Sequence, residues 1–207
     1  MKSRKMYLSL GIICLLASSA IAHDRAWPGK RLASLWPEAA KFTSKQVNLS
    51  AARIAQLEAD GITLGAEDKS PVFYFANAAG KGKSARTLGI ILFIDAYGAN
   101  GNMEISVGMT ADGTVKKLNI WEHSEDKGVA AEEFLNQFIG KKRSDSFKAG
   151  TDYKPAETAR KASDAVALSV KKALGITDAV YGRKEAATPA AVTKTKEQAP
   201  KQGQGRP

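Results

Sequence analysis

The sequence predicts an α+β domain, an antiparallel sheet with helices at both ends of the domain. Three observations favour this class. β-Rich stretches cluster in the middle of the chain, helical patterns precede and follow them, and Asp112-Gly113 marks a tight turn between two strands. With 207 residues and no internal repeat, the chain has room for one well-packed domain and hardly for two.

The first predicted helix covers residues 51–60. Ser50 is a favourable N-cap, Ile54 and Leu57 share one helical face, and Gly61 follows where a helix would end.

Four strands should follow, and their predicted ranges are 72–75, 88–94, 103–109 and 114–121. The third range alternates apolar residues with Glu104, Ser106 and Gly108, which is the period-two pattern of a half-buried strand. Asp112-Gly113 then turns the chain, so that 114–121 can pair with 103–109 as its partner strand.

Two helical patterns complete the domain. The first, at 131–139, places three apolar residues inward: Phe134, Leu135 and Phe138. The second should run from 155 to 174, with Pro155 at its first position, Glu157 in its first turn and Gly175 at its end. Its apolar residues recur at helical spacing, at Ala162, Val166, Ala173 and Leu174.

The N-terminus has the pattern of a secretory signal peptide over residues 1–22. A basic start precedes an apolar run, and small residues allow cleavage before His23. A retained membrane anchor is the alternative, because the apolar run approaches the lower limit for a span. Cys14 is the only cysteine, so the mature chain would contain no disulfide, iron–sulfur ligand or catalytic thiol.

The C-terminal residues 183–207 form a basic tail with no large apolar side chain, so we expect disorder there. The leader carries a charge of +3 and the tail +4, which leaves only +3 of the total +10 for the domain at 23–182. The high pI therefore gives no argument for binding nucleic acid. The tail is interpreted as a soluble extension, with peripheral contact to anionic lipid or an acidic partner as the alternative.

Familiar catalytic patterns are absent from the sequence. His23 and His123 lie too far apart to give a metal-binding spacing. Residues 80–84 lack the spacing of a phosphate-binding loop, and no Ser/His/Asp arrangement can be recognised. The acidic residues between 122 and 133 have a simple interpretation as a solvated loop and helix start.

One stretch, YGANGNMEISVGMTADGTVKKLNIWEHSEDKG at 97–128, carries a more specific pattern. It resembles the FMN-binding domain of the C subunit of the sodium-translocating NADH:quinone reductase, of the G subunit of the Rnf complex and of small secreted flavoproteins. The shared features are a glycine-rich turn, two strands joined by an Asp-Gly turn, and Glu-His-Ser-Glu followed by a glycine. FLNQFIGK at 134–141 continues the match, which covers about residues 47–175.

In that family a D-x-x-[S/T]-G-A-T motif opens the last helix, and its threonine carries FMN through a phosphoester bond in many members. The resemblance assigns these ends to Asp152 and Thr158, whereas Pro155, Ala156 and Glu157 depart from the motif. Pro155 lacks an N–H donor, and the Glu157 carboxylate would repel a phosphate by about 3 kcal/mol at about 6 Å and an effective dielectric of about 20. We therefore expect FMN to be non-covalent or absent rather than covalently attached at Thr158.

The resemblance also implies contacts for the flavin ring. Gly98 and Gly101 would let the backbone approach it, Trp121 would stack on it, and the 122–128 loop would border it, through Glu122, Glu125 and Gly128. Each has a simpler alternative, since the glycines suit a turn, the tryptophan suits a core and the glutamates suit a solvated loop.

The sequence thus predicts an exported protein, periplasmic or secreted, that relays electrons through FMN to a redox partner protein. A membrane-bound protein is one candidate for this partner. No residue stands out as an acid or base toward a substrate, so relay is favoured over turnover. Two alternatives remain: a flavin-free descendant that serves as an interaction or assembly module of a periplasmic complex, and a flavin reductase for a small substrate.

Overall fold

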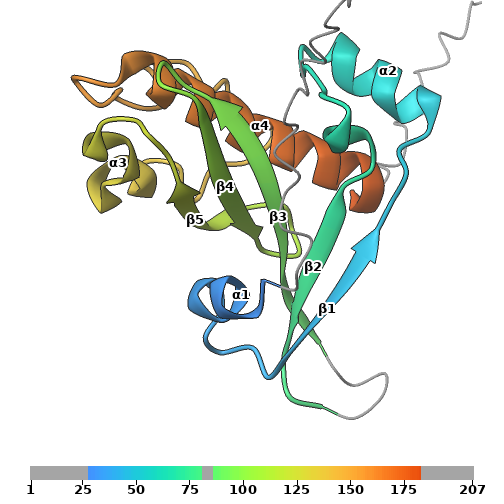
Figure 1. Ribbon diagram of the computed structural model, residues 1–207. Helices are drawn as coiled ribbons and strands as arrows, with labels where there is room; N and C mark the ends of the chain where they lie inside the picture. Colours follow the sequence, from blue (N-terminus) through green and yellow to red (C-terminus); the bar gives the residue numbers. More distant parts are fainter. Residues whose placement is uncertain (1–27, 81–85, 183–207) are drawn as a thin grey trace, which may run out of the picture.

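The computed structural model describes residues 28–80 and 86–182 (Figure 1). The predicted leader, His23, most of the 80–84 stretch and the predicted tail lie outside the described residues. Within the described part of the chain, no helix has the length and apolar content needed to cross a membrane.

Five antiparallel strands form one open sheet, in which each strand pairs with its neighbours in sequence. The strands are β1 (Lys41–Gln46), β2 (Val72–Asn77), β3 (Thr87–Tyr97), β4 (Asn102–Met109) and β5 (Val115–Glu122). The four predicted strands are confirmed. The sequence prediction missed β1, an edge strand in which Phe42 is partly buried and the other five residues are exposed. Such a strand lacks apolar alternation and is held by its pairing with β2.

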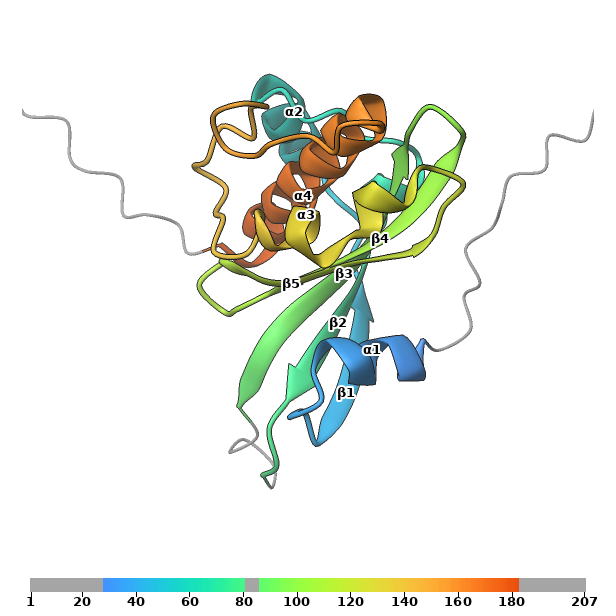
Figure 2. The same ribbon diagram turned by 90° about the vertical axis from the view of Figure 1, so that its left-hand side faces the viewer.

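Helices cover both faces of this sheet, but unequally (Figure 2). The long helix α4 (Arg160–Tyr181) packs on β3 and β4, with α2 (Ala51–Ala59) against it and α3 (Glu132–Asn136) beside β5. These elements enclose the main core. Among the described residues, the opposite face carries only α1 (Gly29–Leu35), which packs over a small separate cluster around Leu32, Trp36 and Ile91. The predicted α+β class with helices at both ends is confirmed.

Helix α2 begins as the sequence predicts. The Ser50 hydroxyl accepts a hydrogen bond from the Arg53 amide at 3.4 Å, Leu57 is fully buried, and Gly61 follows with φ of 75°. Helix α3 is shorter than predicted, but its three predicted inward residues, Phe134, Leu135 and Phe138, are all buried. The described part of the chain also contains two short 3-10 helices, at Glu67–Lys69 and Lys127–Ala130.

The prediction that 103–109 is half-buried was wrong, because β4 is buried on both faces from Ile105 onward. Helix α1 and Trp36 cover the face that the sequence pattern assigns to solvent. An added Cβ at Gly108 would lie 2.9 Å from the Trp36 ring, and one at Gly89 on β3 would lie 2.2 Å from it. The two glycines thus leave space on this face of the sheet for the Trp36 indole, which is only 1% exposed.

The predicted start and end of the last helix were also wrong. Helix α4 begins at Arg160, so Pro155 and Glu157 lie in the preceding turn and outside the helix. It continues through Gly175 to Tyr181, because Gly175 is a packing site: its missing Cβ leaves room for Ile62, whose Cδ1 would lie 2.3 Å from such an atom. Tertiary packing here overrides the usual tendency of glycine to end a helix.

Candidate functional site

Thr158 is an exposed residue in the turn directly before α4. Ala159 takes the N-cap position and provides no side-chain cap, and the first helical turn contains no acidic residue. Arg160 and Lys161, both exposed, occupy that turn instead. Cations are unfavourable at the positive end of a helix dipole, so this terminus is electrostatically suited to an anion.

The acidic loop after β5 reaches this turn through Asp126 and Gly128. The Asp126 carboxylate accepts the Gly128 amide at 2.8 Å. This hydrogen bond, with a smaller contribution from the Thr158 hydroxyl, holds the pKa of Asp126 below its usual value. A Cβ added to Gly128 would lie 3.5 Å from the Cβ of Ala156, which places the two segments side by side.

The same loop contacts the β3–β4 turn through Glu125, which is only 8% exposed. Its carboxylate accepts the Asn100 amide at 2.5 Å, and the Asn100 side chain donates to the Ser124 carbonyl at 3.2 Å. Glu125 also fills the space beside Gly98, where an added Cβ would lie 2.2 Å from its Oε1. Gly101, with φ of 135°, has no atom within 4 Å of its Cβ position and is open.

The structure therefore brings together three of the segments expected to bind flavin: 98–101, 122–128 and the turn at 156–158. Figures 1 and 2 both show the β3–β4 turn beside the start of α4. We call this meeting point the α4 terminus site. Its members from the sequence prediction are Gly98, Gly101, Glu125, Gly128 and Thr158.

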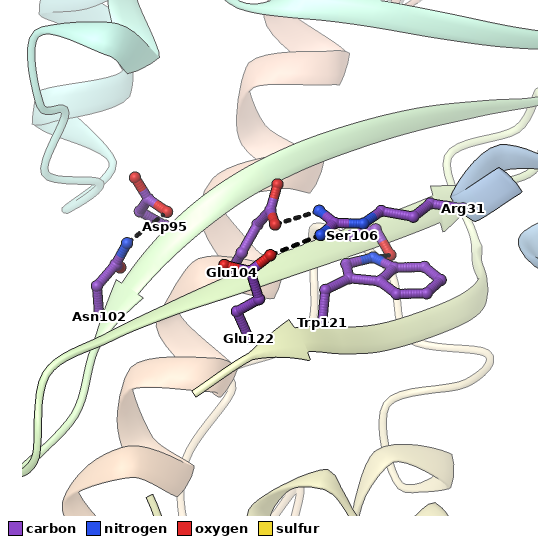
Figure 3. A network of polar contacts seen from close by, with 7 residues as sticks. All are labelled: Arg31, Asp95, Asn102, Glu104, Ser106, Trp121 and Glu122. Carbon is purple, nitrogen blue, oxygen red and sulfur yellow. Dashed lines mark hydrogen bonds and ion pairs between the residues drawn. The ribbon is translucent and has the colours of Figure 1, made fainter. Parts of the chain in front are cut away.

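Trp121 and Glu122 do not belong to the α4 terminus site (Figure 3). They face α1, where Arg31 donates to Glu122 at 2.7 Å and to Glu104, and lies 5.3 Å from the centre of the Trp121 ring. The indole N–H of Trp121 donates to the Ser106 hydroxyl at 2.9 Å. The interpretation of Trp121 as a packed residue fits this arrangement better than a stacking role.

Arg31 also explains how like charges are tolerated on that face. Glu104 lies opposite Asp95 on one side and Glu122 on the other, so three carboxylates form a row across β3, β4 and β5. Like charges in opposite positions destabilise a sheet. Here the guanidinium pairs with Glu104 and Glu122, and the Asn102 amide donates to Asp95 at 3.0 Å.

Asp152 organises the loop between α3 and α4. Its carboxylate accepts hydrogen bonds from the Ser146 hydroxyl and, at 3.1 Å, from the Lys148 amide, and it pairs with Lys141 at 3.3 Å. These contacts flank Phe147, a buried residue in the left-handed region with φ of 55°. Asp152 therefore has a structural role that accounts for its side chain without a cofactor.

Asp152→Asn should lower the melting temperature at pH 7 and have a much smaller effect near pH 2. The hydrogen bond from Ser146, with those from Lys148 and Lys141, lowers the pKa of Asp152 from 3.8 to about 2. A depressed pKa stabilises the fold above the unfolded value, and this contribution is lost as pH falls through the folded value. Thermal melts of both proteins between pH 2 and 7 provide the measurement. A difference in melting temperature that stays constant with pH would contradict the assignment.

Two surface pockets lie away from the α4 terminus site. One is lined by Ala40, Thr43 and Asn77, and the other by Asp60, Arg143 and Lys171. In residues 28–80 and 86–182, no cluster of three His, Cys, Asp or Glu side chains has the arrangement of a metal site.

Sequence reasoning missed two contacts around the predicted site residues, those of Asp126 with Gly128 and of Arg31 with Glu122. Asp126 is two residues before Gly128, which is the spacing of a local side-chain-to-amide turn, so part of its role had a sequence signal. Arg31 had none, because its partners lie 73 and 91 residues away. No protein-family model and no curated protein matches this chain.

Proposed function

We propose that this protein is an exported FMN-binding electron carrier of the FMN-binding-domain type, with its flavin at the α4 terminus site. The observation that carries the proposal is the convergence of 98–101, 122–128 and Thr158. These segments are far apart in sequence, and the resemblance assigns all three to one flavin site. Their contacts through Glu125 and Gly128 support that assignment.

The phosphate end of FMN fits the start of α4. The first-turn amides have no side-chain cap there, and Arg160 and Lys161 add positive charge. Asp126 and the exposed Glu157 oppose this attraction, which favours non-covalent binding over a phosphoester at Thr158.

The ring end fits only in part. Gly101 is open to close approach, whereas Glu125 already fills the space beside Gly98. When bound, FMN supplies one- or two-electron transfer. The chain's own contribution is to bind the phosphate through the α4 amides and to hold the bordering loop through Glu125 and Asn100. The electron acceptor or donor would be a redox protein, at the membrane or in the periplasm.

A second candidate is a flavin-free module that binds or assembles partners in a periplasmic complex. The favouring observation is that Glu125, expected near the flavin ring, is engaged with protein groups: it accepts the Asn100 amide and fills the space beside Gly98.

Titration of FMN against the mature protein, followed by flavin fluorescence, separates the two candidates. We expect quenching that saturates, and a loss of affinity of about tenfold in Lys161→Glu, because the new charge opposes the phosphate. Lys171→Glu, almost three turns further along α4, is the matched control and should bind as the wild type does. A colourless protein that quenches no FMN fluorescence would support the flavin-free module instead.

A further inference from the structure

We propose that the outer face of the sheet, the face that carries α1, binds the chain's own residues 23–27. Trp27 packs there on a patch of aromatic side chains, and Arg25 pairs with a row of carboxylates beside it. Residues 23–27 directly precede α1 in the sequence and lie outside the described residues. The inference goes beyond the proposed function, because this face lies across the sheet from α4 and needs no flavin.

Helix α1 covers only part of the outer face that the described residues form. Trp36 covers the end of the face at Gly89. Beyond it, Tyr74 on β2 and Phe93 on β3 contact each other edge to face, with ring centres 5.6 Å apart, and both are partly exposed. Val72 is two residues before Tyr74, so it shares this face, and it is 36% exposed. We call Val72, Tyr74 and Phe93 the aromatic patch, and an exposed apolar patch of this kind suits a binding surface.

A row of carboxylates borders the aromatic patch. Asp95 follows Phe93 by two residues on β3, so both side chains lie on the outer face, and Asp95 is opposite Glu104. In Figure 3, Asp95 lies on the other side of Glu104 from Arg31. Arg31 divides one positive charge between Glu104 and Glu122. Three carboxylates against one guanidinium favour a further cation, so the surface suits an occupant that combines an aromatic ring with a positive charge.

The chain that precedes α1 begins close to this surface. Pro28 is the N-cap residue of α1, and Arg31 lies in the first turn and reaches Glu104. The helix therefore starts within the length of an arginine side chain from the carboxylate row. Neighbouring strands are about 4.8 Å apart, and five extended residues span up to about 17 Å. The segment before Pro28 is thus long enough to cross from β4 to β2.

The sequence of this segment, His-Asp-Arg-Ala-Trp, provides the side chains that the surface requires. A residue before proline favours extended backbone, and Trp27 precedes Pro28. Alternate side chains of an extended segment share one side, so Trp27 and Arg25 face the same way and Asp24 faces the other. The segment therefore presents an indole and a guanidinium together to the sheet, and turns its own carboxylate away from the carboxylate row.

Limited trypsin digestion of the purified mature protein tests the docking, because cleavage after Arg25 requires release of the segment. We expect this cleavage to be about tenfold faster in Phe93→Ala than in the wild type. It should be about two- to fivefold faster in Asp95→Asn, whose amide oxygen still accepts the Asn102 amide. Leu168→Ala, which removes an exposed side chain from α4, is the matched control and should leave the rate unchanged. Intact mass gives the rates, and equal rates in all four proteins would overturn the inference.

A double-mutant cycle gives a second readout. Trp27→Ala should lower the melting temperature by about 3–5 °C, whereas Ala26→Ser, on the opposite side of the segment, should leave it unchanged. Phe93→Ala should then cost less in the Trp27→Ala background than in the wild type, because its partner is already gone. Additive costs would overturn the inference. A wild-type dimer that Phe93→Ala dissociates would also overturn it, because a second copy of the chain would then occupy the outer face.

Discussion

Gly89→Ala should destabilise the protein by about 3 kcal/mol, near the upper end for overpacking a core. The new methyl group would lie 2.2 Å from the Trp36 ring and 2.8 Å from the Met109 carbonyl oxygen. The carbonyl belongs to a paired strand and is held in place, so the indole must move away from Gly89 and Gly108, and α1 must move with it. Chemical denaturation monitored by tryptophan fluorescence measures the loss.

Gly65→Ala is the matched control for this change, because its Cβ would meet only Asp68 Oδ2 at an ordinary 3.5 Å. Trp36→Ala tests the cause. In the double variant Gly89→Ala/Trp36→Ala, the clash with the indole is removed and only the contact with the Met109 carbonyl remains, so its cost should be below the sum of the single costs. Additive costs would mean that Gly89 acts through the β3 backbone and not through the indole.

Phe138→Ala should cost about 3–5 kcal/mol, the range for removing a fully buried aromatic side chain. Phe138 is 0% exposed, and its ring centre lies 5.4 Å from those of Phe134 and Tyr153. Tyr153 also donates to Asp164 on α4 at 2.5 Å. The cluster thus ties α3 to the segment that leads to Thr158, and we expect the variant to lose flavin binding along with stability.

Ile139→Ala, one residue further on and 41% exposed, provides the comparison. The loss of unfolding free energy should stay below about 1 kcal/mol, because this side chain buries much less apolar surface on folding than Phe138 does. Urea unfolding of both variants gives the two free energies of unfolding. Similar costs for the two positions would show that the aromatic cluster is not what holds this segment.

Local signals predicted most of the fold. Ser50 and Gly61 bound α2 because capping chemistry is local, and Asp112-Gly113 joins β4 to β5 for the same reason. The errors occur where distant residues decide. Gly175 stays helical because Ile62 fills its open side, and β4 is buried on both faces because Trp36 arrives from another part of the chain.

The candidate site shows the same division. Turn glycines and an acidic loop were recognisable, and the structure places both beside Thr158. The orientation of Trp121 and Glu122 toward Arg31 could not be recognised from the sequence. It depends on a register irregularity between Glu104 and Ile105, which puts both side chains on the α1 face. A shift of one residue in register changes which face a side chain occupies, and sequence alone does not record it.

The placement of α1 has a consequence for the order of folding. Its Arg31 pairs with Glu104 and Glu122, which are 73 and 91 residues later in the chain, and Trp36 packs in the space beside Gly89 and Gly108. Contacts of such long range form slowly, because a large loop must close first. Helix α1 therefore cannot complete these contacts, during synthesis, until β4 and β5 exist. A chain that ends before Asn102 lacks Gly108 and both glutamates, so α1 of such an incomplete chain exposes apolar surface that the finished sheet covers.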